Sequence, residues 1–157
     1  MSDRSASRRL RVLEIGVIAA VGMALAGCGV ITKELSSGDF AETIPAALVE
    51  SEIGITDSFA SKGLDGFTFN LVVGVDLDDQ ELSPDDLAGI LRIILENNDI
   101  PSDQIQLSVA ANDGESVDVP QLVQEISPDL KTKASIYGNL SVTNEQAAAI
   151  VKAVWGE

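Results

Sequence analysis

The strongest constraint on the fold is an alternation of apolar and more polar residues from Phe67 to Leu77. Apolar residues at every second position share one face of a β-strand, because successive side chains point to opposite faces. The residues between them include Thr68, Asn70 and Asp76, which favour water. The segment therefore predicts a strand with one buried face, which a single covering layer can bury. That face carries Phe67, Phe69, Leu71, Val73, Val75 and Leu77.

The next segment predicts a helix that lies on this face. Ser83 is a good N-cap, Pro84 fits the first turn, and Asp85 and Asp86 complement the positive end of the helix dipole. Helical spacing then repeats through Leu87, Ile90, Leu91, Ile94 and Leu95. A second alternating segment, 105–111, predicts another strand. A strand, a helix and a strand in series indicate a right-handed crossover.

The remaining elements follow from local signals. We expect a helix capped by Asp39 and ending near Val49, and a strand over 53–60 that is separated by 62–66 from the alternating strand and pairs with it as a hairpin. A short helix is predicted over 120–126, and one last strand over 134–142. Thr143 and Gln146 form a capping box for a C-terminal helix, at whose end Trp155 is expected to pack.

These elements predict an α+β fold: a two-layer sandwich with about four strands in a mixed or antiparallel sheet and helices on one face. The element order is similar to ferredoxin-like and BON-like arrangements. Small sandwiches of this kind host many unrelated activities, so the likeness carries no function. The single acidic domain is expected to span 39–157.

The N-terminal segment has a different composition. Arginines dominate the first eleven residues, an apolar run follows from Ile15 to Gly27, and Leu25-Ala26-Gly27-Cys28 ends it with the chain's one cysteine. This segment resembles bacterial lipoprotein signal peptides, whose pattern is an aliphatic residue, a small residue, Gly or Ala, and then cysteine. The resemblance implies cleavage between Gly27 and Cys28, removal of 1–27, diacylglyceryl and palmitate-type acylation at Cys28, and a short tether over 28–38. It places the protein at the extracytoplasmic face of the cell membrane, anchored by lipid.

Two other interpretations of this segment stay open. The 17 residues from Ile15 to Ile31 reach the lower limit for a transmembrane helix, and Cys28 can also be an ordinary buried thiol. The export route is undecided between the general and the twin-arginine pathways. Ser7-Arg8-Arg9 suggests the latter, but Arg11 and Val12 occupy positions where that pattern prefers Phe and Leu.

Composition excludes several classes of function. Removing residues 1–27 takes away two acids and four bases, which leaves 23 acids, 6 bases and a net charge of −17. Such a surface repels phosphates, so nucleic acid is not an expected partner. The chain has no histidine, and a lipidated Cys28 leaves no thiol, so His-dependent hydrolysis and disulfides are excluded. We expect no enzyme activity and no cofactor.

An acidic run between the alternating strand and its helix is the main candidate for binding. It contains Asp76, Asp78, Asp79 and Glu81, followed by Asp85 and Asp86. Counting from Asp76 as the first position does not match an EF-hand loop, because glycine is missing at the sixth position and an acid at the twelfth. A solvated loop and a helix cap explain most of these acids. Asp113-Gly114-Glu115 is interpreted as a turn.

The sequence therefore predicts a lipid-anchored extracytoplasmic protein with a noncatalytic interaction or structural domain. Its partners are the membrane, through Cys28, and a protein, in a role such as an accessory subunit of a membrane complex. The alternative is a lipoprotein that binds a divalent cation or a cationic solute through the loop around Asp78, Asp79 and Glu81.

Overall fold

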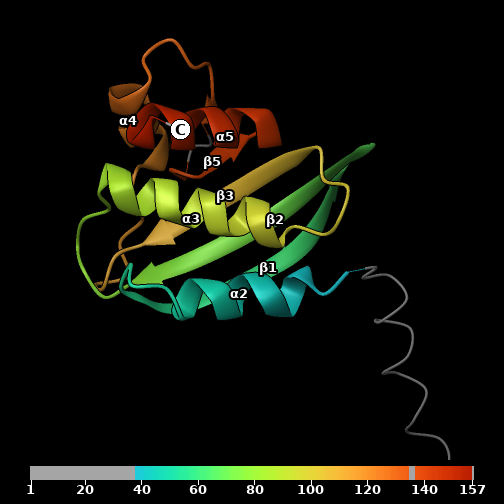
Figure 1. Cartoon of the computed structure of the whole chain (residues 1–157), viewed down its shortest axis with the longest axis horizontal. Helices are drawn as coiled ribbons and strands as arrows, with labels where there is room; N and C mark the ends of the chain where they lie inside the picture. Colours follow the sequence, from blue (N-terminus) through green and yellow to red (C-terminus); the bar gives the residue numbers. More distant parts are fainter. Residues whose placement is uncertain (1–37, 135–136, 157) are drawn as a thin grey trace, which may run out of the picture. The chain divides into compact units, whose positions relative to one another are not determined.

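The alternating segment forms β2 (Thr68–Leu77), an interior strand of a five-stranded mixed sheet (Figure 1). The computed structural model of the protein describes residues 38–134 and 137–156. They belong to a compact unit that begins at Gly38. Along the chain the other elements are α2 (Phe40–Val49), β1 (Ile55–Asp65), α3 (Pro84–Asn97), β3 (Gln104–Ala110), α4 (Val119–Ile126), β4 (Lys133–Ala134), β5 (Leu140–Val142) and α5 (Asn144–Trp155).

The sheet has the strand order β1-β2-β3-β5-β4. β1 and β2 form an antiparallel hairpin. β2 and β3 pair in parallel, and α3 connects them along the chain. β5 pairs antiparallel with both β3 and β4. The predicted α+β fold with a mixed sheet is therefore the fold of the chain. It has one more strand than expected, because β4 adds a two-residue pairing at the edge.

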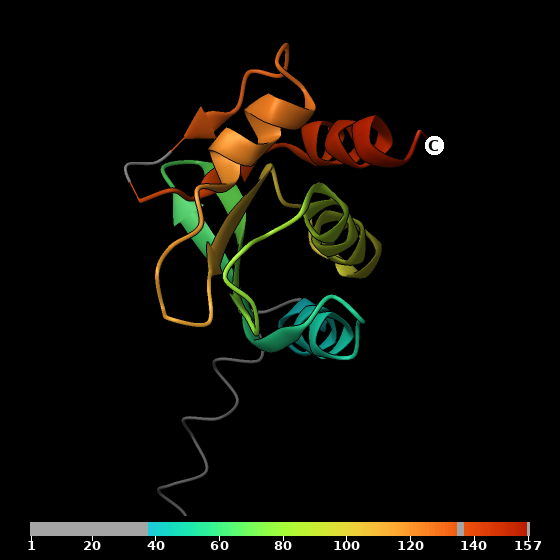
Figure 2. The same cartoon turned by 90° about the vertical axis from the view of Figure 1, so that its left-hand side faces the viewer.

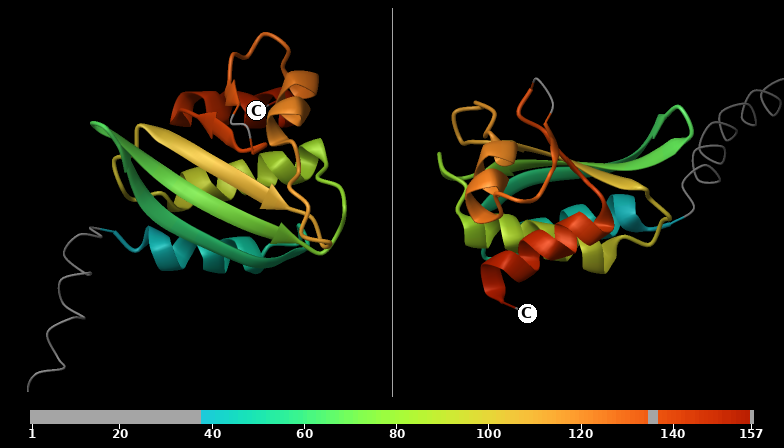
Figure 3. Two further views of the ribbon diagram at one scale, coloured as in Figure 1. Left: turned by 180° about the vertical axis from the view of Figure 1, so that it is seen from behind. Right: turned by 90° about the horizontal axis from the view of Figure 1, so that it is seen from above.

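Helices α2, α3 and α5 cover one face of the sheet (Figure 2). Seen from behind and from above, the opposite face of β1, β2 and β3 has no helix on it (Figure 3). Helix α4 lies near the side of the sheet that contains β5. The core lies between the helix layer and the sheet. Its largest fully buried side chains are Phe40, Ile44, Leu48, Leu71, Leu87, Ile90, Leu91, Ile94, Ile105, Leu107, Leu140 and Ile150.

The helix starts match the sequence signals at α3 and α5. Ser83 Oγ accepts a hydrogen bond from Asp86 N at 3.1 Å, and Asp86 Oδ2 accepts one from Ser83 N at 3.2 Å. Thr143 and Gln146 form the same reciprocal pair at α5. At α2, however, the Asp39 side chain makes no capping hydrogen bond. Asp39 marks the start of the helix as predicted, but through its backbone carbonyl, which accepts from the amides of 42 and 43.

Two strand boundaries differ from the prediction. β1 continues to Asp65, which pairs with Thr68 and leaves Gly66 and Phe67 as a two-residue turn. Gly66 has φ 62°, which glycine adopts without steric cost. Phe67 is therefore in the turn and fully exposed, and Phe69 is 41% exposed, so the prediction that both are buried is wrong. The buried face of β2 begins at Leu71.

The predicted last strand, 134–142, is also wrong as a single element. The chain forms β4, reverses through a turn that includes Gly138 at φ 75°, and returns as β5 beside β4. An alternating pattern does not mark such a reversal, because both strands keep a period of two.

The predicted signal peptide 1–27, Cys28 and the predicted tether up to residue 37 lie outside the described residues, as does Ile136 of the predicted last strand. Within 38–134 and 137–156, no helix has both the length and the apolar character needed to cross a bilayer.

Candidate functional site

The acidic run after β2 folds as a turn attached to its neighbours. The backbone N–H of Asp78 donates to Gly54 O at 2.8 Å, and the carboxylate of Asp79 accepts from Gln80 N at 2.6 Å. Asn112 reaches the same turn, donating from its side chain to Asp78 O and from its backbone to Asp79 O, both at 3.0 Å. These contacts hold the turn at the end of the sheet where β2 and β3 finish.

Asp85 and Asp86 act at the start of α3. Asp86 belongs to the capping box, and Asp85 Oδ1 accepts a hydrogen bond from Trp155 Nε1 at 2.9 Å. The Arg92 guanidinium lies 4.6 Å from the centre of the same indole ring. Trp155 thus packs the end of α5 against α3, as the sequence predicted. Across the described residues no three Asp, Glu, Cys or His side chains are arranged to hold a metal, so the candidates Asp76, Asp78, Asp79 and Glu81 are not gathered into a metal site.

The segment Asp113-Gly114-Glu115 is a turn, as expected. Gly114 has φ 82°, and Asp113 Oδ1 accepts from Glu115 N at 3.0 Å. Ala111 N donates to Glu115 O at 2.8 Å and closes the turn. The Asp113 carboxylate and the Glu115 backbone therefore stabilise the turn.

The tip of the β1–β2 hairpin carries an exposed apolar surface that the sequence interpretation missed. Leu64 is 65% exposed, Phe67 is fully exposed and Phe69 is 41% exposed. Leu64 and Phe69 are direct cross-strand partners, so they share one face of the hairpin. The Lys62 ammonium lies 4.4 Å from the centre of the Phe69 ring. We call Leu64, Phe67 and Phe69 the tip patch.

The tip patch lies on the continuation of the helix-facing side of the sheet. Phe69 precedes Leu71, Val73 and Val75 on that side, yet these three are buried whereas Phe69 is not. The helix layer therefore covers β2 from Leu71 onward and leaves the end of the hairpin uncovered. Burial of a Phe or Leu side chain contributes about 1.5–3 kcal/mol. Covering the tip patch with another apolar surface would therefore be favourable, because folding leaves these side chains exposed.

The loop 98–103 connects the tip patch to the beginning of the domain. Asp103 Oδ2 accepts from Phe69 N, and Phe69 O accepts from Asp103 N, both at 2.8 Å. In the same loop Asp99 Oδ2 accepts from Asp39 N at 2.7 Å, next to Gly38. The start of the domain and the base of the tip are therefore held by one short loop. Both lie at the same end of the domain (Figures 1 and 3).

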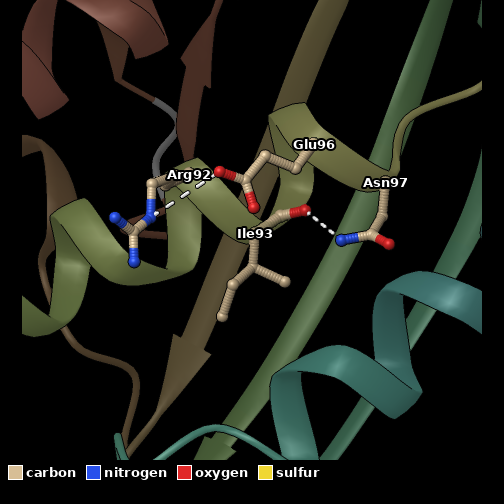
Figure 4. Close-up of polar contacts among 4 residues, drawn as sticks. All are labelled: Arg92, Ile93, Glu96 and Asn97. Atoms are coloured by element: carbon tan, nitrogen blue, oxygen red, sulfur yellow. Dashed lines mark hydrogen bonds and ion pairs between the residues drawn. The ribbon is translucent and has the colours of Figure 1, made fainter.

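Polar contacts fix this loop to the helices on either side. At the end of α3, Asn97 Nδ2 donates to Ile93 O at 2.9 Å (Figure 4). The exposed pair of Arg92 and Glu96, whose charged atoms are 3.9 Å apart, lies one residue earlier in the same helix. Asn98 Nδ2 then donates to Ser102 Oγ at 2.9 Å. Asn144 Nδ2, at the start of α5, donates to Ser102 O at 3.3 Å. These hydrogen bonds therefore hold the loop in a defined position between α3 and α5.

Another exposed aromatic residue, Phe59, has a different environment. It lies on β1 opposite Gly74 of β2, on the face without helices. Its ring lies so close over Gly74 that a Cβ there would be less than 3.0 Å from three ring carbons. Phe59 is 54% exposed, but one face of its ring packs on the sheet. Phe59 is therefore not part of the tip patch.

Sequence reasoning missed the tip patch because alternation shows which face a side chain occupies and not how far the covering helices extend. One signal was present: Gly66 can occupy the first central position of a two-residue hairpin turn, which makes Phe67 the second turn residue.

Comparison with known proteins gave no match: no protein-family model, no curated protein and no solved structure is significantly similar to the chain.

Proposed function

We propose that the protein is a lipoprotein anchored at the extracytoplasmic face of the cell membrane through Cys28, and that its folded domain acts by binding without catalysis. The observation that carries this proposal is Leu25-Ala26-Gly27-Cys28, which follows an arginine-rich start and an apolar run and contains the chain's one cysteine. Two acyl chains at one cysteine anchor a protein stably, because each buried CH₂ contributes about 0.8 kcal/mol.

The organisation of the domain supports this placement. The compact unit starts at Gly38, so only nine residues, 29–37, lie between it and Cys28. The ten residue steps from Cys28 to Gly38 span at most about 35 Å when extended, which keeps the domain near the bilayer surface. The net charge of −17 for the chain from Cys28 onward favours a solvated domain that does not spread over anionic headgroups.

The noncatalytic part of the proposal rests on the chemistry of the side chains. Histidine is absent from the sequence, and lipidation would consume the one thiol. Several acids of the described part of the chain serve in caps and turns, as at Asp79, Asp86 and Asp113, and others join neighbouring segments, as at Asp99 and Asp103. An accessory subunit of a membrane complex fits such a domain. No observation favours the alternative of cation or cationic-solute binding over this one.

Intact-mass measurement of the protein extracted from membranes tests the anchor. We expect a chain that begins at Cys28 and carries the added mass of a diacylglyceryl group, with or without one further acyl chain. The Cys28→Ala variant should keep residues 1–27 or appear in the soluble fraction. A membrane-extracted chain with residues 1–27 and no lipid mass would refute the anchor.

Crosslinking in intact cells tests the proposed binding role. The native lipoprotein should yield a stoichiometric protein neighbour that the unlipidated Cys28→Ala form does not yield. Recovery of no specific neighbour at native abundance would count against an accessory subunit and leave the anchor proposal standing.

A further inference from the structure

We infer that the tip patch inserts into the lipid interface of the membrane that carries the Cys28 anchor, so that the domain touches the bilayer at a second point. This inference rests on the proposed lipid anchor. It names Leu64, Phe67 and Phe69 as a membrane contact, with the interfacial region of a bilayer as the occupant.

The side chains of the tip patch suit a membrane interface. A fully exposed Phe67 beside exposed Leu64 and Phe69 places apolar surface at the outermost point of a hairpin. Aromatic rings suit the interface between headgroups and acyl chains. Lys62, which stacks on Phe69, has a long apolar stem and a charged end that can stay in water while its neighbours enter lipid.

The proposed anchor joins the domain at the end that carries the tip patch. The chain enters the domain at Gly38, beside Asp39, whose amide is held by Asp99 of the loop 98–103. The same loop holds Phe69 through Asp103. A lipid at Cys28, at most about 35 Å along the chain from Gly38, therefore pulls the domain toward the membrane at the end that carries the tip patch.

The opposite end of the domain carries the acidic turn. There the turn of Asp78 is bonded to Gly54, and Trp155 is bonded to Asp85. Asp78, Asp79 and Glu81 lie at this end. The tip end also carries Asp65, Asp99 and Asp103, and the carboxylates of the last two accept hydrogen bonds from backbone amides. Insertion of the tip patch directs the end with the acidic turn away from the bilayer, where a protein partner can reach it.

The experiment places a tryptophan in the patch and measures its contact with lipid. The full-length gene carries Phe67→Trp together with Trp155→Phe, and the lipidated protein is extracted and reconstituted into phosphatidylcholine vesicles. Neutral lipid is chosen because anionic headgroups repel an acidic domain. We expect the emission of the tryptophan at 67 to shift to shorter wavelength and to be quenched by brominated phosphatidylcholine.

Three controls separate insertion from other causes. Val49→Trp in the same Trp155→Phe background places the probe at the far end of α2, at a position that is 46% exposed, and its emission should not be quenched. Wild-type Trp155 should also stay unquenched. Adding Leu64→Ser to the Phe67→Trp protein should reduce the quenching, because an exposed apolar neighbour is lost while the core is untouched.

The outcomes distinguish this inference from the anchor proposal. Intact mass of the reconstituted sample shows whether Cys28 is lipidated. A lipidated protein whose tryptophan at 67 remains unquenched would overturn the inference and leave the anchor intact. A blue shift that depends on protein concentration and needs no vesicles would assign the patch to a second copy of the chain and also overturn it. An unlipidated chain in the membrane fraction would overturn both.

Discussion

The half-exposed ring of Phe59 packs closely over Gly74 of the neighbouring strand. Any side chain at 74 must displace the Phe59 ring, because its Cβ would overlap three ring carbons. The ring is partly exposed and can rotate outward, so the cost is the lost packing and not a buried clash. We expect Gly74→Ala to lower the free energy of unfolding by about 1 kcal/mol, measured by urea denaturation.

A double-mutant cycle checks the mechanism. Once Phe59→Ala has removed the ring, Gly74→Ala should cost little, since the two positions couple through one contact. Equal costs of Gly74→Ala in both backgrounds would contradict the proposed contact.

Trp155 supports a second prediction at the level of single residues. Its indole N–H donates to Asp85, and Arg92 stacks on the ring, so it joins the ends of α5 and α3. Trp155→Phe keeps an aromatic ring but removes the donor. Because the pair is exposed, we expect a loss of only about 0.5–1.5 kcal/mol in thermal or urea unfolding. Asp85→Asn retains an acceptor at this position and should cost less than Asp85→Ala; the reverse order would contradict the assigned hydrogen bond.

At the scale of elements, helix starts that share a sequence signal differ in structure. Ser83 and Thr143 each accept a hydrogen bond from the backbone, whereas the Asp39 side chain makes none. We expect Ser83→Ala and Thr143→Ala each to reduce the free energy of unfolding by about 1 kcal/mol. Asp39→Ala should change it by a few tenths at most, because the helix start there depends on the backbone of Asp39. A cost for Asp39→Ala equal to that for Ser83→Ala would refute the distinction.

The sequence could predict the elements that depend on signals within their own segment. Caps and periodic stripes placed α3, β3, α4 and α5 within a residue or two, because each depends on contacts within its own segment. Strand lengths and reversals depend on pairing partners elsewhere. β1 therefore ran five residues beyond its predicted end at Ala60, and the segment 134–142 divided into two strands. The exposure of Phe67 and Phe69 was missed for the same reason: it depends on where the helix layer ends.

For the whole molecule, the large excess of acids sets the response to salt. The chain from Cys28 onward carries 23 acids and 6 bases, and within its described residues Arg92 and Glu96 form the one close ion pair. Most acids therefore lack a cationic partner nearby, and their mutual repulsion opposes the folded state. Raising NaCl from about 0.1 M to 1 M shortens the Debye length from about 10 Å to 3 Å. We expect the melting temperature to rise, with a stabilisation on the order of 1 kcal/mol.

The cation used in that measurement decides between screening and binding. If the acids act only as a solvated surface, calcium and sodium at matched ionic strength should stabilise the domain equally, since screening depends on ionic strength. The Asp78→Asn/Asp79→Asn variant should then show the same salt response as the wild type, because the hydrogen bonds at this turn involve the backbone of Asp78 and Asp79 and one Asp79 oxygen that asparagine retains. A calcium-specific rise in melting temperature that this variant abolishes would instead demonstrate a cation site at the acidic turn, because only a ligand bound to the folded state stabilises it by mass action.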